Sequence, residues 1–242
     1  MNGPFALPRL HVVTDDNVLA RRSFVDAAAA ALEAGGGEVA LHLRGPGTGG
    51  GALLELASEL RRLAAGESVP FLAVNDRVDV ALAARMRPLW VHLGARSLPP
   101  GVARRLLEAH GGPVPVVVGA STHSASEARE AFREGADYIF FGSVFETASH
   151  PGRKPVGLDG LAEAVAAIRP MGPEESQPVV AIGGMTPERV ASVLAAGARG
   201  VAVVTGVWNA PDPAGAVREY LEALGASPGA VTGTAQSTKE KA

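Results

Sequence analysis

Histidine is the side chain in this sequence best suited to acid–base chemistry, and His123 has the most suggestive position. It stands in the stretch STHS (residues 121–124), after an apolar run and before a segment with helical spacing. Imidazole accepts and returns protons near neutral pH, so His123 can be read as a general acid–base group. It can equally be read as a solvent-facing residue at a helix start. The surrounding residues alone favour neither.

Two glycine-bearing stretches, AIGGMTPER (181–189) and VVTGVW (203–208), could bind a phosphate group. Glycine lets an anion approach the backbone closely, and N–H groups at a helix start attract negative charge. A tight turn is the alternative explanation for the first stretch, but the second stretch favours phosphate. The predicted phosphate-binding residues are Gly183, Gly184, Thr205 and Gly206.

Charged and amide side chains end two further apolar runs. Arg44 offers a fixed positive charge suited to a carboxylate or phosphate, and Asn75 precedes Asp76. Asp76 could ligate Mg²⁺, or it could cap the next helix while pairing with Arg77. Residues 92–100 offer no second carboxylate, so we predict no metal site built by the protein.

Three more histidines, His11, His42 and His92, lie inside apolar runs. His42 should share the face of Arg44, because side chains two apart on a strand point the same way. We interpret His11 and His92 as hydrogen-bonded core residues, because no short-range ligand pair supports zinc.

Predicted strands and predicted helices alternate regularly along the chain, and they must position these residues. Short runs rich in Val, Ile and Leu, too apolar to alternate cleanly, predict strands buried on both faces of a parallel sheet. Alanine-rich segments between them predict helices, with cap signals at Ser23, Ser124 and Thr186–Pro187 and closing glycines at Gly35, Gly135 and Gly197. The predicted strands are 9–14, 38–44, 70–75, 89–94, 115–120, 137–142, 178–183 and 200–206, and the predicted helices are 23–34, 51–65, 77–85, 100–110, 124–134, 158–168, 187–196 and 213–224.

Eight strands alternating with eight helices predict an α/β fold, a single (β/α)8 TIM barrel, with an open doubly wound sheet as the competitor. No break in composition occurs within 9–224, so we predict one domain there, an N-terminal extension over 1–8, and a disordered tail over 225–242. Residues 45–51 read as a flexible loop. Active sites of such barrels lie at the carboxyl ends of the strands, which is where His123 falls.

Composition narrows the class of protein. Of 242 residues, 47% are hydrophobic and 19% charged, as in a globular protein and unlike a disordered one. A net charge of −3 argues against a nucleic-acid partner, and no apolar run is long enough to span a membrane. The amino terminus lacks the pattern of a signal peptide, so we expect a cytoplasmic location.

Several stretches, in order, resemble the thiamine phosphate synthase superfamily: VVTDD, LHLR, AVNDRVDVALA, WVHLG, STHSASEAREAFREGADYIFFGSVFET, VVAIGGMTPERV and GVAVVTGVW. The likeness covers about residues 9–210. It implies a part in thiamine (vitamin B1) biosynthesis, and relatives suggest a homo-oligomer. The superfamily has two main branches, a synthase and a thiazole tautomerase.

The tautomerase branch matches better at three motifs: FGSVFET (141–147), AIGGMTP (181–187) and STHS. The implied activity is an isomerase reaction that aromatises a carboxythiazole phosphate tautomer by proton transfer. The resemblance makes His123 the acid–base catalyst, places Arg44 near the substrate carboxylate, and adds Asn75, Ser121 and Thr147 as pocket residues. It requires no cofactor, and the only partner it implies is the small-molecule thiazole phosphate substrate.

The alternative is the synthase, a transferase that joins hydroxymethylpyrimidine diphosphate to thiazole phosphate with Mg²⁺. Against it, the sequence has Pro46 and Ser149 where that branch has lysines, and Ser97 where it has an acidic metal ligand. A third alternative is a thiazole-phosphate binder or regulator without catalysis.

Overall fold

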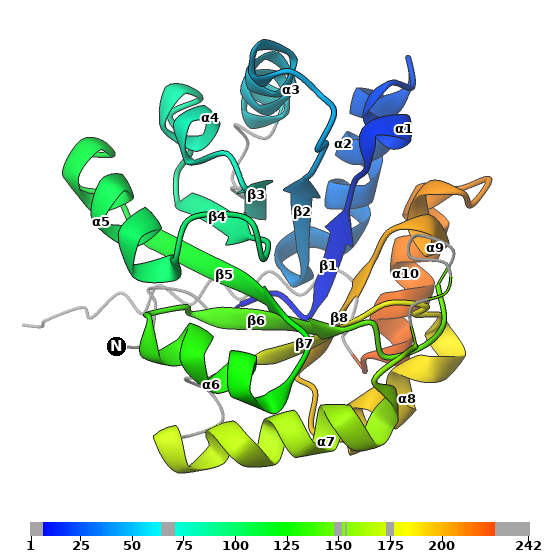
Figure 1. Ribbon diagram of the computed structural model, residues 1–242. Helices are drawn as coiled ribbons and strands as arrows, with labels where there is room; N and C mark the ends of the chain where they lie inside the picture. The colour runs from blue at the N-terminus through cyan, green and yellow to red at the C-terminus, as the bar shows by residue number, and fades with distance from the viewer. Residues whose placement is uncertain (1–6, 64–70, 148–151, 153, 173–176, 226–242) are drawn as a thin grey trace, which may run out of the picture.

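The computed structural model describes residues 7–63, 71–147, 152, 154–172 and 177–225. Eight parallel strands follow one another around a closed barrel, and β8 pairs with β1 to complete it (Figure 1). This confirms the predicted single (β/α)8 barrel over the open sheet. The strands are β1 (Leu10–Val13), β2 (Val39–Leu43), β3 (Phe71–Asn75), β4 (Leu89–Leu93), β5 (Val116–Thr122), β6 (Tyr138–Gly142), β7 (Val179–Ile182) and β8 (Gly200–Val203).

Helices surround the strands on the outside of the barrel (Figure 1). Those expected from the sequence are α2 (Phe24–Gly35), α3 (Gly50–Leu63), α4 (Val78–Ala83), α5 (Pro100–His110), α6 (Ala125–Arg133), α7 (Gly157–Ile168), α8 (Pro187–Ala195) and α10 (Pro213–Ala223). Two short helices, α1 (Asp16–Leu19) and α9 (Thr205–Trp208), and two 3₁₀ turns at Gly36–Glu38 and Arg169–Met171 were not expected.

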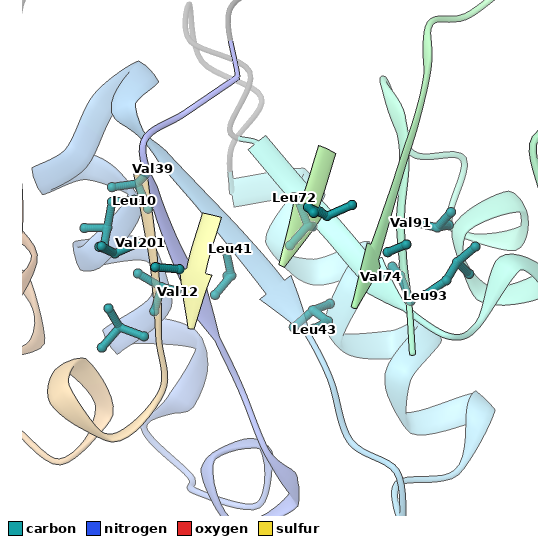
Figure 2. Close-up of a cluster of buried hydrophobic side chains, with 14 of the residues drawn as sticks. Leu10, Val12, Val39, Leu41, Leu43, Leu72, Val74, Val91, Leu93 and Val201 are labelled. Carbon is teal, nitrogen blue, oxygen red and sulfur yellow. The ribbon is translucent and has the colours of Figure 1, made fainter. Parts of the chain in front are cut away.

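Side chains of each strand alternate between two apolar layers. One layer lies between strands and helices; Figure 2 shows part of it, including Leu10, Val12, Leu41 and Val74. The other fills the barrel interior with Val13, Ala40, Ala73, Trp90, Val117, Tyr138, Phe140, Val180 and Ala202. Because a strand has a period of two, the polar residues His11, His42, Asn75, His92 and Ser121 share the inward face.

The predicted helix caps are confirmed in part. The hydroxyl of Ser124 accepts from the backbone N–H of Glu127 at 3.2 Å, which confirms that cap. Ser23 and Thr186 occupy N-cap positions without a capping hydrogen bond from their side chains. Gly135 and Gly197 follow their helices with positive φ, as expected, but at α2 the positive φ belongs to Gly36 and not to Gly35.

Several boundaries differ from the predictions, two of them beside the site residues. The strand expected over 200–206 ends at Val203, because the chain turns into α9, where the Trp208 indole N–H donates to the carbonyl of Val13 at 2.9 Å. Part of the loop at 45–51 is ordered as a turn, and α3 begins at Gly50. Residues 1–6 and 226–242, most of the predicted extension and tail, lie outside the described residues. Within the described part of the chain, no helix is both long and apolar enough to cross a membrane.

Candidate active site

The barrel brings the predicted site residues to one rim, because parallel strands in a closed barrel all end on the same side. Most of them follow neighbouring strands at the carboxyl end, so segments far apart in the chain become adjacent. They are Arg44 after β2, Asn75 at the end of β3, Ser121 in β5 and His123 after it, Thr147 beyond β6, Gly183 and Gly184 after β7, and Thr205 and Gly206 at the start of α9.

The ring of His123 is held from the β6 side of this rim. Its Nδ1 donates to the carbonyl oxygen of Gly142, and its backbone N–H donates to a carboxylate oxygen of Glu127 at 2.7 Å. A carbonyl oxygen can only accept, so Nδ1 carries the proton in the neutral ring. Nε2 has no hydrogen-bond partner among the described residues. The lone pair on Nε2 is therefore available for an acid–base or hydrogen-bonding role.

The two glycines after β7 are in close contact with the segment that follows β6. Gly183 and Gly184 have φ values of 98° and 62°, and a Cβ on Gly183 would lie 2.5 Å from Cβ of Ser143. The β6–α7 segment thus packs directly on this turn, and the amide of Phe145 donates to the Gly183 carbonyl at 3.1 Å. Neither glycine N–H donates a hydrogen bond within the described residues. Both needs for glycine, the positive φ and the tight packing, are therefore structural, while the amides are left available.

Thr205 and Gly206 form the exposed first turn of α9, which follows β8. Their backbone N–H groups likewise have no partner in the part of the chain that the structure describes. A Cβ on Gly206 would lie 2.3 Å from the hydroxyl of Tyr220, which gives this glycine a packing role. Thr205 also lines a pocket of about 290 Å³, together with Asp15, Asn17 and Arg21 among others.

Arg44 and Asn75 are positioned by different means. The hydroxyl of Thr14 bridges the backbone of Arg44, accepting from its N–H at 2.8 Å and donating to its carbonyl at 2.9 Å. The Arg44 guanidinium forms no ion pair within the described residues. Asn75 is 7% exposed, and its Oδ1 lies 3.1 Å from Nδ1 of His42.

Histidines inside the barrel are kept neutral. His42 is fully buried and contacts His11, with 2.9 Å between His42 Nε2 and His11 Nδ1. Burial lowers the pKa of His42 to about 4. Burial also lowers the pKa of His11 well below its usual value, and the neighbouring His42 lowers it further. The prediction that His11 and His92 are hydrogen-bonded core residues is confirmed.

Asp76 does not cap a helix. It has a φ of 64°, and its Oδ1 accepts from the backbone N–H of Gly94 at 2.8 Å and from the hydroxyl of Ser97. Arg77 pairs with Asp79 at 2.6 Å, so the alternative in which Asp76 caps the next helix and pairs with Arg77 is wrong. The exposed carboxylate of Asp76 thereby connects the end of β3 to the segment after β4.

Three contributions to this rim were missed from the sequence. Asp16 accepts from the Gly47 N–H at 3.0 Å and from the Thr48 hydroxyl at 2.6 Å, which ties the loop after β2 to the start of α1. The Thr48 hydrogen bond is also the main cause of the lowered pKa of Asp16. Arg189 donates to the Gly184 carbonyl, with its guanidinium 4.6 Å from the centre of the Phe145 ring. The hydrogen bond between His92 and Ser121, at 2.9 Å, is the third.

Metal ligation by the protein alone has little support within the described residues, which contain no group of three or more His, Cys, Asp or Glu placed to hold an ion. Ser149, where the synthase branch has lysine, lies outside the described residues.

Comparison with known proteins extends this picture to nearly the whole chain. Residues 10–207 match the family described as thiamine monophosphate synthase. The thiamine-phosphate synthase of Chlorobium phaeobacteroides is 39% identical over 220 residues, covering 90% of this chain and 97% of that protein. The thiamine-phosphate synthase of Chloroflexus aurantiacus is 41% identical, covering 89% and 92%.

A solved structure agrees with these sequences. The thiamine phosphate pyrophosphorylase of Pyrococcus furiosus superposes with a TM-score of 0.71 at 32% identity, over 90% of this chain and 95% of that one. Two of these proteins are named thiamine-phosphate synthase and the third thiamine phosphate pyrophosphorylase, and none of the three is named a tautomerase. The comparisons therefore do not support the predicted tautomerase branch or the isomerase class, and the synthase alternative fits better. From the family match and these identities, the chain belongs to the thiamine monophosphate synthase family and takes part in thiamine biosynthesis.

Proposed function

We propose that this protein is a thiamine-phosphate synthase, a transferase that joins hydroxymethylpyrimidine diphosphate to thiazole phosphate. The observation that carries the proposal is the 39% identity to a protein of that name over 90% of the chain. A shared fold alone would not suffice, since one fold hosts many reactions.

The chemistry of this transfer matches what the rim offers. The thiazole nitrogen supplies a lone pair to the methylene carbon of the pyrimidine, a C–N bond forms, and the C–O bond to diphosphate breaks. Diphosphate leaves with the bonding electrons, and the thiazole becomes a thiazolium cation. The attacking nitrogen carries no proton, so the step needs anion binding and orientation rather than a general base.

Anion binding falls to two parts of the rim in this proposal. The backbone amides of Gly183, Gly184, Thr205 and Gly206, which have no hydrogen-bond partner within the described residues, would hold the phosphate of the thiazole, as helix starts and glycine turns do elsewhere. The Arg44 guanidinium, which forms no ion pair within the described residues, would contact the diphosphate. Asn75, Ser121 and Thr147 would line the heterocycle pocket.

This reaction implies Mg²⁺, and the residues present fit the ion with one carboxylate ligand, Asp76. Asp76 is exposed at the rim and uses only Oδ1 in described hydrogen bonds, so one carboxylate oxygen can face a cation. Mg²⁺ is often held by one or two carboxylates together with substrate phosphates. Bound there, it would neutralise charge on the leaving diphosphate. Where the synthase branch has a further acidic ligand, this chain has Ser97, whose hydroxyl donates to Asp76 and adds no negative charge.

Thiazole tautomerase is the second candidate, and two observations favour it. Ser97 and Pro46 remove charges that the synthase branch uses for diphosphate and metal. The hydrogen bond from His123 to Gly142 leaves Nε2 free, as proton transfer at a thiazole ring would require. In this candidate His123 is the catalyst, whereas in the synthase it only contributes to the pocket.

A paired assay separates the candidates. The purified protein is given hydroxymethylpyrimidine diphosphate, thiazole phosphate and Mg²⁺, and thiamine phosphate is measured; in parallel it is given the carboxythiazole phosphate tautomer, and aromatisation is measured. For a synthase we expect thiamine phosphate formation that falls at least about tenfold in Asp76→Asn, because a charged ligand is lost. The His123→Asn variant should lose far less than Asp76→Asn.

Aromatisation that disappears in His123→Asn, with no thiamine phosphate formed, would overturn the synthase in favour of the tautomerase. Binding of thiazole phosphate without either product would indicate a binder or regulator. Circular dichroism of both variants must match that of the unmodified protein for the comparison to count.

A further inference from the structure

A chain of hydrogen bonds crosses the barrel interior and ends at the rim. The indole Nε1 of Trp90 lies 2.9 Å from the hydroxyl oxygen of Tyr138, which lies 3.1 Å from Nδ1 of His92; His92 Nε2 lies 2.9 Å from the hydroxyl of Ser121. The members come from the adjacent strands β4, β5 and β6 (Figure 1). Trp90, Tyr138 and His92 are at most 1% exposed, while Ser121 is half-buried at the rim.

The direction of every hydrogen bond in this chain follows from its first member. An indole N–H can only donate, so the Tyr138 oxygen accepts from Trp90. The one hydrogen of Tyr138 then goes to His92 Nδ1, because no other acceptor for it exists among the described residues and buried donors are almost always paired. Nδ1 is thereby an acceptor, and the ring proton resides on Nε2, where it is donated to Ser121.

The surroundings exclude the doubly protonated ring. Burial, followed by the nearby His42 and His11, lowers the pKa of His92 well below its usual value, and burial raises the pKa of Tyr138 well above its usual value. The Phe140 ring lies 3.9 Å from the His92 ring, centre to centre, and so limits its rotation. Both links thus stay neutral, and the direction of the chain is fixed.

We infer that His92 is a positioning residue: the Trp90–Tyr138–His92 chain makes His92 Nε2 a donor to Ser121, so the Ser121 O–H cannot be donated to His92 and is presented to the rim as a hydrogen-bond donor. The site therefore takes a lone-pair acceptor at this point, such as a ring nitrogen of a heteroaromatic substrate. His92 cannot accept a proton from Ser121 through Nε2, so Ser121 is not an activated nucleophile. The identity of the heterocycle rests on the proposed function, but the direction of the chain does not.

The first test measures the ring proton directly and needs no substrate. With histidine labelled with ¹⁵N, two-bond ¹H–¹⁵N spectra of the unliganded protein report the tautomer of His92, which is assigned from the signal lost in His92→Gln. We expect the Nε2–H form alone. A wild-type ring protonated on Nδ1 would overturn the inference, whatever reaction the protein catalyses.

The second test removes the donor to His92 while keeping its ring neighbour. In Tyr138→Phe nothing holds the Nδ1 lone pair as an acceptor, so the ring should no longer be confined to the Nε2–H form, and Ser121 can then donate inward. We expect KM for the heterocyclic substrate to rise about fivefold, as for the loss of one neutral hydrogen bond, with kcat changed less than about twofold. Ser121→Ala should raise KM similarly and leave the His92 tautomer unchanged.

Thr122→Val is the matched control. It removes a buried hydroxyl on the same strand, but that hydroxyl donates to the Phe140 carbonyl and faces away from the barrel interior. Neither KM nor the tautomer should change. A shifted tautomer with unchanged KM in Tyr138→Phe would refute the link to substrate. If Tyr138→Phe fails to fold, the wild-type spectrum and Ser121→Ala still decide. Absence of synthase activity in the wild type refutes only the proposed function.

Discussion

Replacing Gly183 by alanine tests whether the turn after β7 is as tightly constrained as its contacts indicate. Two costs are expected. With a φ of 98°, an L residue loses about 1–2 kcal/mol from backbone strain. The new Cβ would lie 2.5 Å from Cβ and 2.7 Å from Cα of Ser143, and overpacking of this kind costs a further ~1–3 kcal/mol. The Ser143 Cα is backbone, so it cannot rotate away.

We therefore expect Gly183→Ala to lower the free energy of unfolding by about 2–5 kcal/mol, measured by urea denaturation followed by circular dichroism. Two glycines separate the two costs. Gly36 has a φ of 51°, and no atom lies within 4 Å of the position that a Cβ would take, so Gly36→Ala should show the strain cost alone, about 1–2 kcal/mol. Gly37 has neither feature, so Gly37→Ala should be neutral or stabilising by up to about 1 kcal/mol.

Equal losses for Gly183→Ala and Gly36→Ala would refute the reasoning, because the β6–α7 segment would then yield without cost. Where the variant stays folded, the displaced amides should also raise KM for thiazole phosphate. The same measurement on Gly37→Ala should show no change.

Three further predictions follow from buried polar contacts. The pKa of His42 is about 4 in the folded protein and near 6.5 in the unfolded chain, so the unfolded chain binds more protons between these two pH values. Stability is therefore lost as the pH falls from about 6.5 to 4. The His42→Gln variant should remove about 3 kcal/mol of that loss, measured by urea titrations at pH 7 and pH 4. An equal pH dependence in both proteins would contradict this. One carboxylate oxygen of Asp137 accepts from Arg104 at 2.6 Å and from the Val118 N–H at 2.7 Å, so Asp137→Asn should cost about 1–3 kcal/mol in thermal or urea unfolding, and an unchanged midpoint would show these bonds to be unimportant. Ser124→Ala should cost about 1 kcal/mol because it removes the N-cap of α6, whereas Ser23→Ala, at a cap without the hydrogen bond, should cost less; the reverse order would refute the capping argument.

Branch assignment shows where short motifs mislead. The stretches around His123, Glu146 and Gly183 favoured the tautomerase, while sequences related over about 90% of the chain carry the synthase name. Local motifs report on a loop, and in this barrel the loops after β5, β6 and β7 pack on one another, so their residues are also constrained by contact. The clash that a Cβ at Gly183 would make with Ser143 is an example of such a constraint.

The barrel could be predicted from the sequence: strands that are apolar on both faces indicate a parallel sheet, and eight repeats of strand and helix favour the closed barrel over an open sheet. The sequence also placed His123, Arg44 and the glycines at strand ends. It could not reveal α1 and α9, since helices of four residues are stabilised by contacts such as that of Trp208 with Val13, far away in the chain.

The orientation of the polar groups, by contrast, depends on contacts between strands that are far apart in the chain. His92 and Tyr138 are 46 residues apart, and nothing local to either indicates that they share a hydrogen bond. The barrel brings them together in an apolar interior where every donor needs an acceptor, and this requirement selects the ring nitrogen that carries the proton. Likewise, the Gly142 carbonyl that holds His123 belongs to the next strand, so the direction of its imidazole was fixed by strand pairing.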